Sequence, residues 1–340
     1  MELKINYAYV ISEFVVGFLS VAGNSLVLVA MYKVKSLRTQ TNCFIASLAV
    51  ADILTGLVVG PLAVISHIGL PHNFYGCLLI NSLVILFTRC SVTSLTAVTL
   101  DRYLAICHPY SYRRRMTFRV TISLVVVSWV VGILFGLVPL MGWNKGKENF
   151  KGDCSFRNVI CLEYVVYFVF FAGNIIPFLF MVCVYTHIFF IIRKAKAADS
   201  KLISATACAG HVKPHHLWRE TRKTFSLVLV VIVFEACWLP IYIHASVSLL
   251  APEYSPSYEF VLFAVVLCHA NSFVNPIVYA FSLKAFRRAF MQILTGNNAL
   301  VIPGYNTYGT SLSTAVYHPP RRGASSVPMI SLTSSTPGPQ

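Results

Sequence analysis

Seven long apolar stretches divide this chain, and they constrain its fold more than any other feature of the sequence. They fall at 8–33, 42–67, 75–105, 120–142, 162–192, 221–249 and 258–282. A helix needs roughly 20 mostly apolar residues to cross the hydrocarbon core of a bilayer. Of the 340 residues, 56% are hydrophobic and only 11% are charged, which excludes a soluble globular protein. The sequence therefore predicts an all-α membrane protein, a seven-transmembrane helix bundle.

Polar side chains lie inside all seven stretches. A polar or ionisable group at mid-bilayer depth is costly, so by default it faces the bundle interior and marks a functional site. Because every predicted span carries one, we expect a solvated polar core. These residues are Asn24, Asp52, Arg89, Ser91, Trp129, Asn174, Glu235, Trp238, Asn271 and Asn275.

The positive charges fall largely in alternate loops. A formal net charge of +15 would by itself suggest nucleic-acid binding. Most Lys and Arg residues, however, lie in the segments 33–38, 113–119, 193–223 and 284–288. The positive-inside rule places these segments in the cytoplasm. We predict a multi-pass plasma-membrane protein with an extracellular amino terminus, a cytoplasmic carboxyl terminus and no nucleic-acid partner.

The chain changes character after the seventh span. Residues 284–290 alternate apolar and basic side chains at helical spacing, which predicts a short amphipathic cytoplasmic helix on the membrane lipid. From Asn297 onward Pro, Gly, Ser and Thr dominate, a composition typical of disorder. We therefore divide the chain into a seven-transmembrane domain, 1–295, and a disordered cytoplasmic tail, 296–340.

Three of the ten cysteines lie on the predicted extracellular side, where disulfides persist. They are Cys77, Cys154 and Cys161. We favour a bond between Cys77 and Cys154, which would tether the loop between the fourth and fifth spans to the bundle. A bond that uses Cys161 instead stays open.

Short motifs recur at matching depths in the spans. They are Asp101-Arg102-Tyr103, Trp129, Cys237-Trp238-Leu239-Pro240 and Asn275-Pro276-Ile277-Val278-Tyr279, together with Asn24 and the segment 47–52 that ends in Asp52. As a set they resemble the rhodopsin-like (class A) G-protein-coupled receptors over residues 8–292. The resemblance implies a receptor, not an enzyme, that couples an extracellular small molecule to a heterotrimeric G protein.

Arg102 is a charge at the membrane edge and needs a partner there. Asp101 is adjacent, and Glu220 begins the sixth span. An Arg–carboxylate clasp between the third and sixth helices would hold the cytoplasmic face closed until a switch releases it. The alternative is a surface ion pair worth less than ~1 kcal/mol. We assign the switch to Asp101, Arg102, Tyr103, Glu220, Pro276 and Tyr279.

Four polar residues converge below Trp238 in this interpretation: Asp52, Ser91, Asn271 and Asn275. An ionised carboxylate at mid-bilayer needs a counter-ion. The resemblance implies an allosteric sodium ion that stabilises the inactive state. The alternative is a water-filled hydrogen-bond network with Asp52 partly protonated. We predict no other cofactor.

The ligand-facing positions are similar to those of adenosine receptors. Val84 stands where amine receptors carry an aspartate, and His269 stands where opsins carry the retinal lysine. The runs Cys154-Ser155-Phe156, 139–144, 163–168 and 269–272 look like the adenosine family. In that family the loop Phe stacks on the purine, the third-span Thr meets the ribose, and the seventh-span His contacts the sugar while pairing with a first-span Glu. Carried over, these roles fall on Phe156, Thr88, His269 and Glu13. A simple loop aromatic over the bundle mouth is the alternative for Phe156.

Other positions depart from that family. Ala245 replaces the Asn that grips adenine, Arg157 replaces the loop Glu, Arg89 replaces a Gln and Tyr242 replaces a His. Loss of a bidentate partner costs roughly 1–3 kcal/mol, or 10- to 100-fold in affinity. Two gained cations favour the hypothesis of an anionic ligand held by Arg89 and Arg157. Alternatively, Arg89 pairs internally with Glu235 and Arg157 is only solvated.

Our interpretation is an adenosine-receptor-like receptor that activates a heterotrimeric G protein, with Trp238 at the base of its pocket. A receptor of the same fold for an anionic or other non-adenosine ligand, a transporter, and a non-signalling scaffold are the alternatives. Tail hydroxyls are candidates for receptor kinases and arrestin, or are merely solvated. They are Ser325, Ser326, Ser331, Thr333, Ser334 and Ser335.

Overall fold

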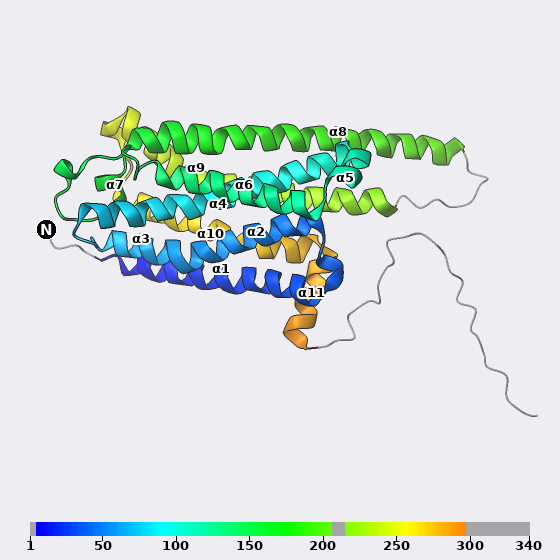
Figure 1. Cartoon of the computed structure of the whole chain (residues 1–340), viewed down its shortest axis with the longest axis horizontal. Helices are drawn as coiled ribbons and strands as arrows, with labels where there is room; N and C mark the ends of the chain where they lie inside the picture. Colours follow the sequence, from blue (N-terminus) through cyan, green and yellow to red (C-terminus); the bar gives the residue numbers. More distant parts are fainter. Residues whose placement is uncertain (1–4, 206–214, 297–340) are drawn as a thin grey trace, which may run out of the picture. The chain divides into compact units, whose positions relative to one another are not determined.

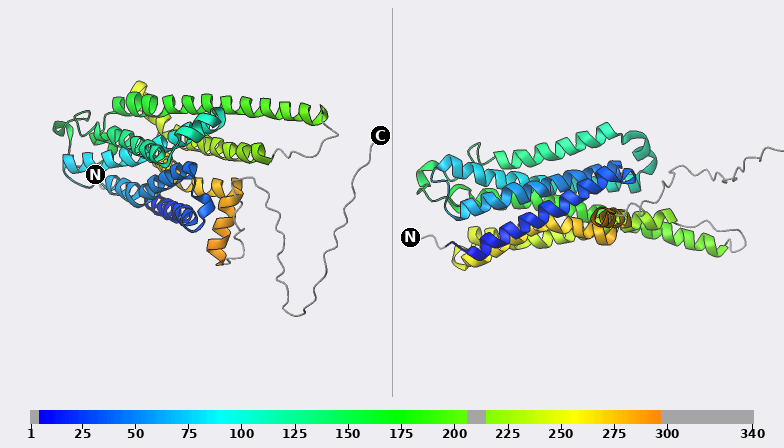
Figure 2. Two further views of the ribbon diagram at one scale, coloured as in Figure 1. Left: turned by 45° about the vertical axis from the view of Figure 1, so that its right-hand side comes forward. Right: turned by 90° about the horizontal axis from the view of Figure 1, so that it is seen from below.

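The computed structural model describes residues 5–205 and 215–296, apart from the side chains of Arg113, 195–196, 198–205 and 215–223. In this part of the chain, seven helices are long and apolar enough to cross a membrane, which confirms the predicted spans (Figures 1 and 2). They cover Tyr7–Lys33, Gln40–His67, Phe74–Cys107, Phe118–Leu137, Tyr164–Lys194, Thr224–Leu250 and Tyr258–Ser282.

The third span lies at the centre of the packing. Its helix α4 contacts α2, α3, α6, α8 and α9, and α1 packs against α10, so the first and last spans close the bundle. The helices are α1 (Tyr7–Lys33), α2 (Gln40–Leu54), α3 (Gly60–His67), α4 (Phe74–Cys107), α5 (Pro109–Arg115), α6 (Phe118–Leu137), α7 (Phe156–Val159), α8 (Ile176–Ala205), α9 (His215–Leu250), α10 (Tyr258–Ser282) and α11 (Lys284–Thr295).

Five of the helices begin at a capping side chain. The caps are Asn6 for α1, Thr39 for α2, Asn73 for α4, Thr117 for α6 and Ser257 for α10. Each cap accepts a hydrogen bond from the backbone N–H three residues later, which satisfies one of the free donors of the first turn. A side chain next to the first helical residue therefore fixes where each of these helices begins.

The fourth span ends earlier than its hydropathy predicted. We expected it to reach residue 142, whereas α6 ends at Leu137 and a turn covers 138–142. Pro139 cannot continue the helical hydrogen bonds, and Gly142 adopts a φ of 126°, which an L side chain rarely takes. Apolar side chains in this turn extended the hydropathy signal beyond the helix.

Two span prolines follow wide, π-helical turns. Thr55–Val59 (η2) precedes Pro61, and Tyr164–Ile175 (η4) precedes Pro177. Proline lacks an N–H and its ring displaces the carbonyl four residues earlier, so a wider turn accommodates the local mismatch. Pro240 and Pro276 lie inside α9 and α10. The irregular backbone of the second and fifth spans therefore lies just before a proline.

The bundle exposes apolar side chains and buries polar side chains among an apolar core. Phe18 is 73% exposed, although Val27 and Ala30 on the same helix are fully buried. Asn24 is also fully buried, and its amide donates to the carbonyls of Ser20 and Ser272, both at 2.9 Å. A broad exposed apolar surface in place of charged side chains is what a lipid-facing helix bundle requires.

One disulfide joins Cys77 to Cys154, as predicted, and Cys161 is free. The bond ties the loop after the fourth span to the start of α4. The N–H of Cys154 also donates to the carbonyl of Gly69 at 3.0 Å, so the loop contacts two neighbouring segments. We call this end of the bundle the disulfide end, and the opposite end of α4 the Arg102 end.

Helix α11 turns away from the direction of α10 (Figure 1). Its buried side chains are Phe286, Ala289 and Phe290, while Arg287 and Arg288 are exposed. The Phe286 ring lies 5.7 Å from that of Tyr279, between ring centroids. The helix is amphipathic, as predicted; its contact with lipid stays a prediction. The tail from residue 297, including the predicted phosphorylation sites, lies outside the described residues.

Two glycines let α6 approach α4 closely. A Cβ added to Gly132 would lie 2.7 Å from Cys90 Sγ, and one added to Gly136 would lie 2.5 Å from Leu86 Cβ. Both glycines are buried. Backbone contact of this kind replaces side-chain interdigitation where small residues repeat every fourth position.

Replacing Gly136 by Leu should therefore destabilise the fold. We expect the free energy of unfolding to fall by about 1–3 kcal/mol or more, because the new side chain overpacks the α4–α6 contact. The measurement is the thermal unfolding midpoint of the purified protein in detergent. Val130→Leu, on the half-exposed face of the same helix, is the matched control. Equal midpoints for the two variants would contradict this packing.

Candidate functional site

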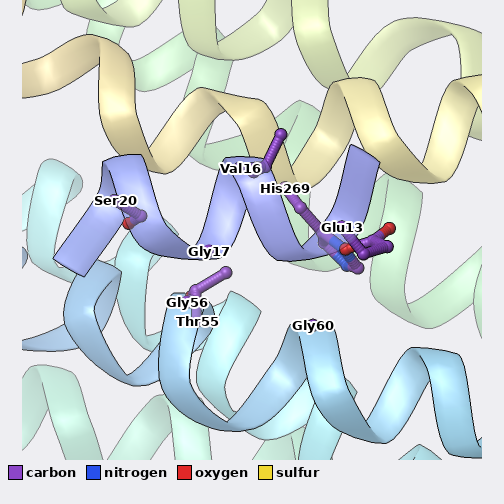
Figure 3. A pocket seen from close by; sticks show the side chains of 8 residues that line it. All are labelled: Glu13, Val16, Gly17, Ser20, Thr55, Gly56, Gly60 and His269. Carbon is purple, nitrogen blue, oxygen red and sulfur yellow. The ribbon is translucent and has the colours of Figure 1, made fainter. Parts of the chain in front are cut away.

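Glu13 and His269 form a buried pair between α1 and α10. His269 Nδ1 lies 2.8 Å from Glu13 Oε2, and the residues are 5% and 2% exposed. Figure 3 shows the two side chains meeting beside a crevice, one that is too narrow for a water molecule. Glu13 Oε1 has no hydrogen-bond partner among the residues described. The structure thus brings together two residues that are 256 positions apart.

Thr88 lines a second small cavity below Trp238. Its hydroxyl donates to the carbonyl of Val84 at 2.8 Å, so the Thr oxygen keeps its capacity as an acceptor. The cavity has room for about one water molecule. Its lining consists of Thr55, Thr88, Ser91, Phe234, Trp238, Cys268, Asn271 and Ser272. Members of the predicted ligand pocket and of the predicted ion site therefore share one space.

Arg89 is almost completely buried, at 1% exposed. Its guanidinium donates to the Tyr242 hydroxyl at 2.7 Å and to the Gly173 carbonyl at 3.2 Å. It also lies 5.1 Å from the centroid of the Trp238 ring, an arrangement that favours a cation–π attraction. The Tyr242 ring stacks on Trp238, with centroids 5.6 Å apart. Arg89 thus links the third, fifth and sixth spans from within.

Glu235 is not the partner of Arg89. Its Oε2 accepts a hydrogen bond from Asn174 Nδ2 at 2.8 Å, and Arg89 instead uses Gly173 and Tyr242. The alternative prediction that Arg89 is engaged inside the bundle is therefore confirmed. Its predicted partner, Glu235, was wrong. Arg89 and Glu235 thus bond to two consecutive residues of the fifth span, Gly173 and Asn174.

The disulfide end carries an unpredicted contact between Arg157 and His244. Arg157 of α7, predicted to be either a ligand group or solvated, donates to Nε2 of His244 on α9. His244 is 4% exposed, and Ala245 beside it is also buried. Phe156 packs against the apolar cluster that includes Tyr242 and Val159. A lone His near the end of an apolar helix carried no signal, because its partner is 87 residues away.

Asp52 is fully buried and accepts two hydrogen bonds. They come from Ser91 Oγ at 3.2 Å and Asn275 Nδ2 at 2.8 Å, which joins three of the four predicted ion ligands. Asn271 lies in the adjoining cavity, and its buried Oδ1 has no hydrogen-bond partner in the part of the chain described. Within the same residues no group of three His, Cys, Asp or Glu side chains is placed to hold a metal ion.

Arg102 and Asp101 pair at the other end of α4. Arg102 Nη2 lies 2.6 Å from Asp101 Oδ2, and the same guanidinium donates to the Thr41 hydroxyl. Asp101 Oδ1 accepts from the Tyr112 hydroxyl at 2.8 Å. Burial and the Asp101 carboxylate raise the pKa of Tyr112 to about 12, so its hydroxyl stays a donor. The side chain of Glu220, the other predicted partner, lies outside the described residues.

The remaining switch residues lie near this end of the bundle. Tyr103 makes ring contacts with His108 and His187, at 5.7 and 5.9 Å between centroids. Tyr279 is 1% exposed, and its hydroxyl has no hydrogen-bond partner among the described side chains and backbone. Pro276 packs close to Gly23, where an added Cβ would lie 3.1 Å from the proline ring.

The Arg89–Tyr242 contact gives a test of how this cation is held. Tyr242→Phe should lower the free energy of unfolding by about 1–3 kcal/mol, because it removes an acceptor from a buried charge. In an Arg89→Met background the same substitution should cost much less, since no charge is left unsatisfied. Thermal unfolding of the two single variants and the double variant measures the coupling. Additive effects would show that the hydrogen bond contributes nothing.

Comparison with known proteins matches the sequence of this chain to a family. The family model for the 7 transmembrane receptor (rhodopsin family) matches residues 23–279. The chain is 35% identical over 307 residues to the adenosine receptor A2b of Gallus gallus, covering 84% of this chain and 88% of that protein. It is 35% identical over 291 residues to the adenosine receptor A3 of Ovis aries, covering 84% and 89%.

A third relative extends the match along more of this chain. The adenosine receptor A2a of Homo sapiens is 32% identical over 331 residues, which cover 94% of this chain and 79% of that protein. The chain therefore belongs to the rhodopsin family of seven-transmembrane receptors, a multi-pass membrane-protein family, and is similar to adenosine receptors along most of its length.

Proposed function

We propose that this receptor senses an extracellular small molecule of the purine nucleoside type and activates a heterotrimeric G protein. The observation that supports this most is the buried Glu13–His269 pair. Thr88 and Trp238 line a second small cavity in the same bundle. An imidazole and a hydroxyl satisfy sugar hydroxyls, and the Phe156 ring offers a face for a base. The relatives named adenosine receptors support the same class of ligand.

The proposed orientation places the disulfide end outside the cell. The segments rich in Lys and Arg adjoin the spans at the Arg102 end of the bundle. The positive-inside rule assigns these segments to the cytoplasm. A disulfide also persists best in an oxidising compartment. In this orientation Phe156 and Arg157 line the extracellular mouth, and Arg102 faces the G protein in the cytoplasm.

Trp238 is the proposed link between the two ends. Its ring contacts Tyr242 above and Phe234 below, with centroid distances of 5.6 and 5.9 Å. A ligand that displaces Tyr242 or Arg89 changes the support of Trp238 and so of α9. Movement of α9 at the Arg102 end then opens a groove for a partner helix. Asp101 and Tyr112 hold Arg102 in place before that movement.

The residues around Asp52 fit a sodium ion. The chemistry suits a hard monovalent cation: one carboxylate, the Ser91 hydroxyl, and the unpartnered Asn271 Oδ1 next to a cavity of about one water. When bound, the ion would neutralise Asp52. The chain's own residues hold that carboxylate between the second, third and seventh spans.

Ligand-dependent signalling tests the proposed function. Cells that express the receptor should change cyclic-AMP levels in response to at least one member of a panel of purine bases, nucleosides and nucleotides. Arg102→Ala should remove the response while surface expression persists, because Arg102 organises the cytoplasmic end. Solute flux in liposomes without a G protein would instead support a transporter.

Sodium sensitivity tests the ion site separately. Replacing choline by sodium at constant ionic strength should weaken agonist potency, because the ion stabilises the inactive state. Asp52→Asn should abolish this difference, since it removes the charge but keeps the shape. A dose–response curve for the best agonist of the panel is the measurement. The same sodium effect in both proteins would exclude Asp52 as the ion ligand.

A further inference from the structure

Arg157 and His244 fix each other's hydrogen-bonding roles at the disulfide end. A guanidinium has donors and no acceptor. Because Arg157 donates to His244 Nε2, that nitrogen is the acceptor and the ring is neutral in this contact. The ring proton therefore lies on Nδ1, which is buried and has no hydrogen-bond partner among the described residues. The pair offers only donors to a neighbour.

No carboxylate forms an ion pair with Arg157 in the part of the chain described. Within the described residues, ion pairs closer than 4.0 Å join Arg102 to Asp101 and His269 to Glu13, and none includes Arg157. Ala245, next to His244, contributes a methyl group. Arg157 therefore has no carboxylate in direct contact, and the Nδ1–H of His244 is an unsatisfied donor.

The position of this pair relates it to the proposed ligand. Phe156 and Arg157 are consecutive residues of α7, and Phe156 packs with the cluster that contains Tyr242, two residues before His244. A purine that stacks on Phe156 places its polar edge beside Arg157. A 6-amino group is a donor there and finds only donors. A 6-oxo group is an acceptor and forms a charge-assisted hydrogen bond.

We propose, building on the proposed function, that this receptor selects a 6-oxopurine nucleoside over a 6-aminopurine nucleoside through Arg157, with His244 holding its guanidinium in place. Arg157 is the specificity-determining residue, and His244 is a positioning residue. Arg89 is not part of this selection, because its guanidinium is buried and engaged by Tyr242 and Gly173.

The test compares inosine with adenosine, which carry the same sugar and differ in the 6-substituent. In the cyclic-AMP assay, inosine should be about 10-fold more potent than adenosine, the effect expected for one unpaired buried donor. Arg157→Glu should reverse the order, because a carboxylate accepts from the 6-amino group and repels the 6-oxo group. Lys151→Glu changes the charge of the same loop away from this pair and should keep the wild-type order.

A further variant and an expression control distinguish the possible results of this assay. His244→Phe should reduce the inosine preference without reversing it, because it frees Arg157 but leaves its charge. Surface biotinylation confirms that each variant reaches the membrane. Equal or greater potency of adenosine on the wild type would overturn this inference and leave the proposed function intact. Greater potency of adenosine 5′-monophosphate than of either nucleoside would assign Arg157 to a phosphate and also overturn it. Silence to the whole panel would overturn both.

Discussion

The bilayer core offers no water, so every polar group within a span must find its partner inside the bundle. This constraint explains the arrangement of the interior. Asn24 bonds to backbone carbonyls of two spans, Asp52 to Ser91 and Asn275, and Arg89 to Tyr242 and Gly173. Apart from the bond between Asn24 and Ser20 within α1, each of these contacts joins two different spans. The same groups provide the polar interior that a receptor needs for its ligand and its switch.

Helix α4 makes such contacts at several depths along its length. Cys77 anchors the loop at the disulfide end, Arg89 supports Tyr242 and Trp238, and Ser91 reaches Asp52. Arg102 pairs with Asp101 at the opposite end. Gly132 and Gly136 let α6 pack closely against α4, whereas α4 and α9 share a smaller contact.

Contacts in the site could be predicted from the sequence where both residues match the family pattern. Glu13 and His269 meet as the resemblance implied, and Asp52 meets Ser91 and Asn275. Contacts of the residues that depart from the adenosine-receptor pattern could not be predicted in this way. Arg89 donates to a hydroxyl and a backbone carbonyl and does not pair with Glu235, and Arg157 donates to an imidazole. Side-chain type states what a group can donate or accept, but not which of several distant partners comes within reach.

The sequence by itself determined the spans and the family, and it favoured one disulfide without excluding another. The spans and the family depend on hydropathy and short motifs, which are properties of residues close together in the sequence. Only the tertiary structure decided the end of the fourth span, the partner of Arg89 and the Arg157–His244 contact. Those outcomes depend on where separate helices place their side chains, because a hydrogen bond forms only within about 3 Å.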